Sequence, residues 1–314
     1  MAKTIGPSGG YLKDAELISR YGIRRSIRTL GNCKNVRYSE CNGAAMVALL
    51  EDAKKLGFNS NFWQQDDPEW DGKVLYQDAV KASRYGLPGL VDGRLSDKVD
   101  RLVSKYSELI GAGLENNWHG PIWDMPSVLA GLPEPGLGFA EMPVRDRLIR
   151  IMLSGFCSGS IDHESINRRG KAIITLLAAI DALGYPFEAK ILSCGMIEGG
   201  PHSGQKSVTE IRIHESGQTF DLQRMAFMLG HVAPIRHLLY AFETYVQDGA
   251  RTWYYDNALE EAIRQATVAD GGVALDPMLG HSGDEKWNDD KSAQQWVEAQ
   301  ISRIDKEARA NMGG

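Results

Sequence analysis

The chain of 314 residues is long enough for one large domain or two ordinary ones around a substantial core. Hydrophobic residues make up 43% and charged residues 24%, as in ordinary globular proteins, and no stretch reaches the roughly 20 apolar residues of a membrane span. The net charge of −6 argues against non-specific coating of nucleic acid. We expect a cytoplasmic protein, because the sequence has no apolar signal segment and its four cysteines form no CxxC pair.

The basic excess of the chain lies near the N-terminus. Residues 13–22 predict a short helix that ends at Gly22. Six cations follow one another with no acid between them: Arg20, Arg24, Arg25, Arg28, Lys34 and Arg37. The first four would share about one helical face, and Lys34, Arg37 and Tyr38 would follow in an extended run. This asymmetry of charge points to a partner.

The remainder of the first half predicts helices and a connection. Residues 43–57 form an amphipathic pattern that ends at Gly57, and a second helix is expected from the N-cap Ser96 to residue 113. Residues 111–143 are rich in Gly and Pro and predict a long connection with a short helix near 125–132. We place a domain boundary here, between a mainly helical region over 1–143 and an α/β domain over 144–314.

The second half alternates strands with helices. Residues 144–155 predict a strand, 166–184 a long apolar helix ended by Gly184, and 187–196 another strand, which together are typical of a parallel βαβ unit. Further elements are expected at 209–216 (strand), 221–228, 235–246 and 257–267 (helices), 271–277 (strand) and 291–310 (helix). The pattern predicts an α/β fold with a Rossmann-like sheet and crossover helices.

Residues 147–192 resemble the opening βαβ unit of a von Willebrand factor A (vWA) domain. In that family the first strand ends in Asp-x-Ser-x-Ser, which begins a divalent-metal site. Ser158 and Ser160 match the two serines, but Phe156 stands in the place of the aspartate. A hard divalent cation needs anionic oxygen ligands, so we expect a degenerate loop with no metal and no cofactor, in which the serines cap the helix or turn the loop. Asp162 is the nearby carboxylate that could substitute.

A wider resemblance is to a phage-borne family of vWA-like proteins. It rests on a "D-x-x-x-x-L-A-G-x-P" turn and an "R-R-G … D-A-L" helix, matched here by Asp124, Leu129, Ala130, Gly131, Pro133, Arg168, Arg169, Gly170, Asp181, Ala182 and Leu183. The resemblance implies a vWA-type sheet. Some phages with their own RNA polymerase carry an accessory protein that binds single-stranded DNA and recruits the polymerase, and we expect this chain to be related to such proteins.

Nucleic-acid contact is the function with most local support. Guanidinium groups pair with phosphates and stack on bases, and single strands are held by basic grooves with aromatic platforms. The helix start after Ser160 could also accept an anion, with Arg168 and Arg169 close behind. The expected site for single-stranded DNA comprises Arg20, Arg24, Arg25, Arg28, Lys34, Arg37, Tyr38, Arg168 and Arg169.

Two other functions stay open. The chain is a protein–protein adaptor if its arginine-rich strip pairs with internal acids, with the acidic loop at 64–71 or with a partner. An enzyme acting on phosphate esters or nucleotides would need carboxylates that converge on Ser158, and the sequence displays no such pair. It also has no P-loop, no G-x-G-x-x-G and no G-x-S-x-G. We therefore expect a non-catalytic protein.

Overall fold

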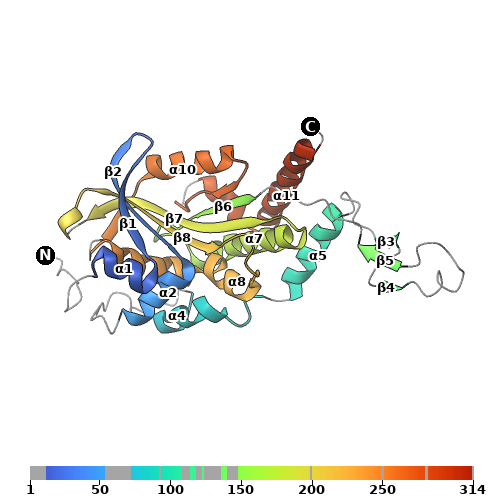
Figure 1. The fold of residues 1–314 in the computed structure, drawn as a ribbon, viewed down its shortest axis with the longest axis horizontal. Coiled ribbons are helices and arrows are strands. Elements are labelled where there is room, and N and C mark those ends of the chain that lie inside the picture. Colours follow the sequence, from blue (N-terminus) through green and yellow to red (C-terminus); the bar gives the residue numbers. More distant parts are fainter. Residues whose placement is uncertain are drawn as a thin grey trace, which may run out of the picture.

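The structure is a computed structural model that describes residues 12–53, 72–91, 93–107, 114–117, 122–123, 136–139, 148–198, 200–248, 251–279 and 282–312. Its centre is a mixed β-sheet with interleaved helices, which confirms the predicted α/β fold (Figure 1). In the described ranges no helix is both long and apolar enough to cross a membrane.

The sheet has seven strands from both halves of the chain. They are β1 (Arg24–Leu30), β2 (Cys33–Asn42), β6 (Ile149–Ser154), β7 (Phe187–Glu198), β8 (Lys206–His214), β9 (Arg251–Tyr255) and β10 (Val273–Leu275). Their order is β1-β2-β8-β7-β6-β10, and β9 pairs with the end of β7. The pairs β10·β6, β6·β7 and β2·β8 are parallel, whereas β7·β8 and β1·β2 are antiparallel.

The predicted βαβ unit is confirmed as β6, α7 (His163–Ala182) and β7. The Asp162 carboxylate caps α7 by accepting a hydrogen bond from the backbone N–H of Ser165 at 2.7 Å. Helix α7 buries an almost continuous run from Ala172 to Ile180, as expected for a helix held between a sheet and other helices. The polypeptide leaves it through Gly184, whose φ of 74° lies in the left-handed region.

The expectation that Arg20, Arg24, Arg25 and Arg28 share a helical face is wrong. Helix α1 (Asp14–Tyr21) ends at Gly22, which has a φ of 70°, and the following residues form the β1–β2 hairpin. Strand β2 pairs with β8, so this part of the predicted helical region belongs to the same sheet as the second half. The pairing uses the Val36 and Tyr38 side chains, which are buried against β-strand neighbours and override the helical spacing of the arginines.

Helices cover the two faces of the sheet unequally (Figure 1). One face packs on the large core formed with α1, α2 (Gly43–Asp52), α4 (Tyr76–Tyr85), α5 (Gly93–Ser107), α7, α8 (Leu222–Gly230), the π-helix η4 (Pro234–Leu239), α9 (Tyr240–Val246) and α11 (Asp290–Met312). The other face has a smaller core, in which Met152, Leu192 and Val208 contact Leu259 of α10 (Asn257–Ala269). Two short 3₁₀ helices, η3 (Gly200–His202) and η5 (Ser282–Trp287), complete the list.

The connection between the two predicted regions contains three short strands. Strands β3 (Leu114–Asn117), β5 (Gly136–Phe139) and β4 (Ile122–Trp123) form a second antiparallel sheet. The predicted short helix at 125–132 and the boundary at 143 lie outside the described residues. The boundary therefore stays a prediction, although the main sheet unites strands from both sides of it.

Helices α7 and α8 cross at a pair of glycines. A Cβ atom added to Gly170 would lie 2.0 Å from the carbonyl oxygen of Gly230, far inside van der Waals contact. The two backbones therefore touch, which only glycine allows at this position of α7.

Candidate nucleic-acid interface

The β1–β2 hairpin divides the predicted arginine strip between two faces. Alternate side chains of a strand point to opposite faces of the sheet. Arg25 lies on the face of α9, where its guanidinium reaches the carbonyl of Val246 at 3.1 Å. Arg24 and Arg28 lie on the other face, with Glu40 of β2. The two faces give these arginines different roles.

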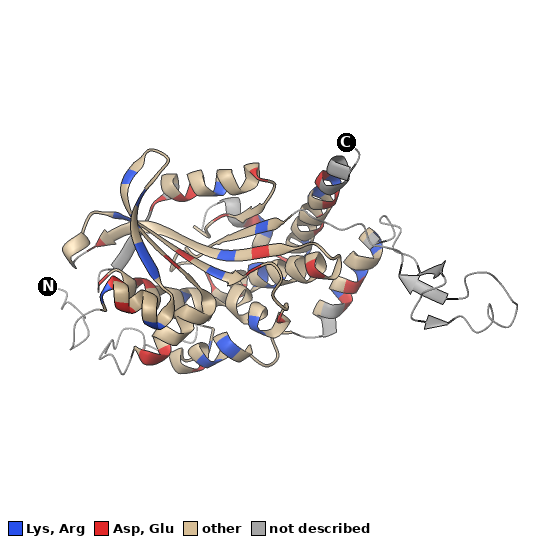
Figure 2. Cartoon of the chain, in the orientation of Figure 1, with Lys and Arg blue, Asp and Glu red and all other residues tan. Residues whose placement is uncertain are grey.

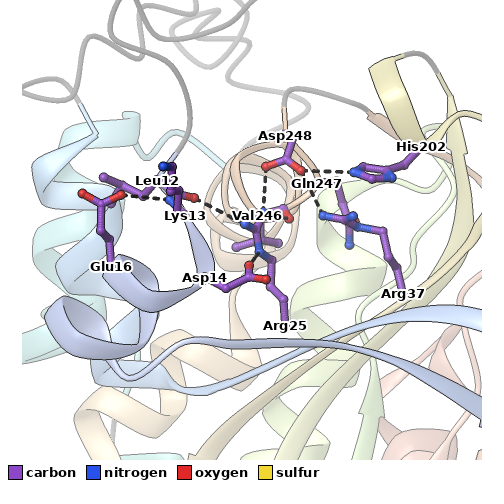
Figure 3. Close-up of polar contacts among 10 residues, drawn as sticks. All are labelled: Leu12, Lys13, Asp14, Glu16, Arg25, Arg37, His202, Val246, Gln247 and Asp248. Atoms are coloured by element: carbon purple, nitrogen blue, oxygen red, sulfur yellow. Dashed lines mark hydrogen bonds and ion pairs between the residues drawn. The ribbon is translucent and has the colours of Figure 1, made fainter.

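Arg25, Arg37, His202 and Asp248 form what we call the inner cluster (Figure 3). Arg25 Nη1 lies 2.7 Å from one carboxylate oxygen of Asp248, and Arg37 Nη2 lies 3.0 Å from the other. His202 Nε2 is 3.3 Å from the second oxygen. The arginine side chains are only 12% and 13% exposed, so this pairing is less screened by water than a surface salt bridge.

Further hydrogen bonds fix the inner cluster to its surroundings. Arg25 donates from Nε to Asp14 at 2.5 Å, and Arg37 donates from Nε to the side-chain oxygen of Gln247 at 2.9 Å. Asp14 and the four residues of the inner cluster line a polar cavity of about 460 Å³. Because the two arginines are matched there by Asp14 and Asp248, the cavity has little net positive charge. We conclude that the inner cluster anchors the hairpin to the end of α9.

Neutralising Asp248 should therefore weaken the fold. Asp248 has a φ of 57°, which Asn tolerates, so Asp248→Asn removes the charge without adding backbone strain. We expect a loss of about 2 kcal/mol in the free energy of unfolding, since two poorly exposed guanidinium groups lose their carboxylate. Glu51→Gln, which breaks the more exposed pair with Arg84, should cost less than about 1 kcal/mol. Urea denaturation measures both; equal losses would contradict an anchoring role.

Arg20, Arg24, Arg28 and Lys34 form the second group, which we call the outer cations. Arg24 is 71% exposed and Arg28 37%, and both lie near the single carboxylate of Glu40, at 4.0 and 2.9 Å. Arg20 and Lys34 are exposed, and neither has an ion pair with an acid in the described part of the chain. Figure 2 shows basic residues along the hairpin. The outer cations are the part of the predicted site that solvent reaches.

Tyr38 is not a free platform for a base. Its ring is 7% exposed, lies 3.7 Å below the Arg28 guanidinium carbon, and its hydroxyl donates to Glu210 at 2.6 Å. Burial, followed by the charge of Glu210, raises the pKa of Tyr38. The stacked Arg28 is held in place by this cation–π contact.

Arg168 and Arg169 have partners within the protein, and the burial of Arg169 corrects its assignment to a nucleic-acid site. Arg168 donates to the carbonyl of Trp287 at 2.6 Å and pairs with Asp290 at 3.6 Å. Arg169 is 3% exposed and reaches the carbonyl of Ser154 at 3.5 Å. Its positive charge also lowers the pKa of buried Glu260, which burial raises to about 7. A buried guanidinium with these contacts cannot face a phosphate backbone.

The loop after β6 is held by hydrogen bonds within the protein. The hydroxyls of Ser158 and Ser160 lie 2.9 Å apart and turn the loop, whereas the cap of α7 is Asp162. Both Asp162 oxygens accept from Ser165, at 2.7 and 2.8 Å, and these bonds lower the pKa of Asp162 against the effect of burial. Arg236 of η4 donates a hydrogen bond to the carbonyl of Ile161 in this loop at 2.6 Å. In the described ranges no group of three His, Cys, Asp or Glu could hold a metal ion.

Nothing in the sequence indicated the distant partners of the arginines. Asp248 and Gln247 lie more than 200 residues from Arg25 and Arg37, and no local pattern connects them. Arg236 and Glu260 were also missed, since neither belongs to a recognisable motif. One general rule applies to the sequence: arginines are seldom buried without a partner. The rule predicts that buried arginines have partners, but it does not say which residues these are.

These features define an α/β protein in which Arg236 and a pair of serines hold the loop after β6. The chain belongs to the family described as domain of unknown function DUF7192, which matches residues 43–307. The β1–β2 hairpin and its outer cations precede the matched residues. No curated protein and no solved structure gives a significant match.

Proposed function

We propose that this protein is a non-catalytic accessory protein that binds single-stranded nucleic acid through the outer cations. The observation that carries the proposal is the division of the arginine strip. Arg25 and Arg37 are matched by Asp248 and fix the hairpin, while Arg24, Arg28 and Lys34 reach solvent on the hairpin and Arg20 is exposed in the last turn of α1. A hairpin anchored in this way presents its cations at defined positions, which lowers the entropy lost on binding.

The proposed contact is small and strongly dependent on salt. Each phosphate that pairs with a cation on a single strand contributes a slope of about −0.7 to log K against log salt, so four contacts give at most about −3. The net charge of −6 disfavours contacts elsewhere on the surface and restricts binding to this strip. A phage origin, a cytoplasmic location and a phage RNA polymerase as the recruited partner belong to the same proposal, and rest on the resemblance to phage-borne proteins.

Binding of a labelled oligothymidylate, followed by fluorescence anisotropy across a salt titration, tests the proposal. The informative variant is Arg20→Ala/Arg24→Ala/Lys34→Ala, because it leaves the inner cluster and the Arg28–Tyr38 stack intact. Lys81→Ala/Lys291→Ala/Lys306→Ala is the control, with the same change of net charge at exposed positions of other helices. We expect wild type and control to bind alike at about 50 mM salt, and the hairpin variant to bind at least about tenfold more weakly with a flatter slope.

A protein–protein adaptor is the second candidate function. Four of the nine residues predicted to contact nucleic acid favour it, because their side chains have partners within the protein. They are Arg25, Arg37, Arg168 and Arg169. If wild type binds no oligonucleotide at about 50 mM salt, where phosphate contacts are strongest, or if hairpin and control variants lose affinity equally, nucleic-acid binding is rejected and the adaptor is preferred.

A further inference from the structure

A cavity of about 290 Å³ lies beside the crossing of α7 and α8 and is also lined by residues of α5. The contact between Gly170 and Gly230 brings the two helices together, and the small residues Ala226 and Gly230 leave room beside the crossing. Asn167, Lys171 and Thr175 follow one another at intervals of four residues and therefore line it from one face of α7. Helix α5 contributes Leu95 and Lys98 from the opposite side.

The polar groups of this cavity are mainly hydrogen-bond donors. Lys98 and Lys171 come from different helices, and neither ammonium group pairs with an acid in the part of the chain that the structure describes. The side-chain oxygen of Asn167 accepts from the backbone N–H of Val232 at 3.2 Å, which leaves its NH₂ group as a donor. The one acid in the lining, Asp290, lies 3.6 Å from Arg168, which compensates its charge.

His231 adds a neutral donor. Its Nδ1 accepts from the backbone N–H of Ala233 at 3.1 Å, which places the ring proton on Nε2. Burial lowers the pKa of His231 to about 4, so the ring stays uncharged at neutral pH. The net positive charge of the cavity therefore comes from the two lysines.

The remaining walls are apolar. Leu90 and Leu95 lie on the side of α5, and Ile174 and Ala226 on the sides of α7 and α8. Small-molecule sites combine such walls with a few convergent polar groups, in cavities of roughly 300–1,000 Å³. This cavity lies at the lower end of that range, which limits the ligand to about the size of a nucleoside monophosphate.

We propose that this cavity binds a small organic phosphate, with the phosphate between Lys98 and Lys171 and the body of the ligand against Leu90 and Leu95. Two ammonium groups match a phosphate dianion, and the Asn167 amide supplies a further donor. The cavity is separate from the hairpin, so this inference does not depend on binding of nucleic acid.

Isothermal titration calorimetry of the full chain with adenosine monophosphate, glucose 6-phosphate, inorganic phosphate and adenosine tests the proposal. We expect at least one of the two phosphate esters to bind more tightly than either inorganic phosphate or adenosine. Lys98→Ala/Lys171→Ala should weaken that binding at least about tenfold, because two charge-assisted hydrogen bonds are lost. Lys81→Ala/Lys306→Ala, at exposed lysines of α4 and α11, is the matched control with the same change of net charge and should bind as wild type does.

Three results would overturn the proposal. One is the absence of binding by both esters; another is binding of inorganic phosphate or adenosine that is as tight as that of the esters. The third is unchanged ester affinity in the double lysine variant. Circular dichroism of that variant verifies its fold, and Lys171→Ala alone, at an exposed position, provides a second reading if the double variant is unstable. The hairpin variant used for oligonucleotides should retain ester binding, which separates the two proposals.

Discussion

Gly170→Ala is expected to destabilise the protein by about 3 kcal/mol, the upper end of the usual cost of overpacking a core. A Cβ at this position would meet the Gly230 carbonyl oxygen at 2.0 Å and its Cα at 2.3 Å. Both are backbone atoms, so no side chain can rotate away and the two helices must separate. Separation opens gaps in the core beside Ile173 and Ile174, which adds to the cost of the clash.

The sign of this prediction is informative. In an isolated helix, Gly→Ala stabilises by about 1 kcal/mol, so propensity alone predicts a more stable protein. Thermal or urea denaturation distinguishes the two, and Lys171→Ala, one residue further along α7 and exposed, serves as the control. A Gly170→Ala protein as stable as wild type would show that α7 and α8 do not cross in contact.

The contribution of two buried glutamates to stability is expected to fall between about pH 5 and pH 8, because burial raises the pKa of both carboxyl groups. Burial raises the pKa of Glu243 to about 7, against the opposing hydrogen bonds from Ser193 and Thr209. Glu260 behaves similarly, with Ser154 and Arg169 in opposition. A raised folded-state pKa means that the folded protein holds a proton that the unfolded chain has already lost. The stabilisation is therefore complete below about pH 4.5 and lost as the pH rises through about 7.

Glu243→Gln isolates the contribution of one group. Glutamine keeps the shape of the neutral acid but cannot ionise, so the variant should match wild type near pH 5 and exceed its stability at pH 8. A shift from 4.5 to about 7 corresponds to about 3 kcal/mol in the free energy of unfolding at the higher pH. Urea denaturation at both pH values measures the difference. Glu164→Gln, at an exposed position in the first turn of α7, should show no such pH dependence, and a constant difference for Glu243→Gln would contradict a neutral buried acid.

Local sequence was sufficient for the βαβ unit. The apolar run of α7, with Asp162 before it and Gly184 after it, contains its own start and stop signals, and most residues of the flanking strands β6 and β7 are buried. Sequence also placed a loop between the first strand and this helix, with Ser158 and Ser160 in it. Sequence could not show that Arg236 donates a hydrogen bond to this loop, because the loop and η4 come together only in the folded core.

The arginine strip shows what only the tertiary structure decided. The sequence determined that six cations occur between residues 20 and 37 without an acid among them, and this unusual charge distribution holds whatever the fold. Whether those cations can contact a partner depends on Asp248, which is 223 residues from Arg25. Asp248 reaches Arg25 because the end of α9 lies against β1. Ion pairs depend on distance in space and on burial, and neither is encoded by local spacing. The structure therefore separates Arg25 and Arg37 from Arg20, Arg24, Arg28 and Lys34.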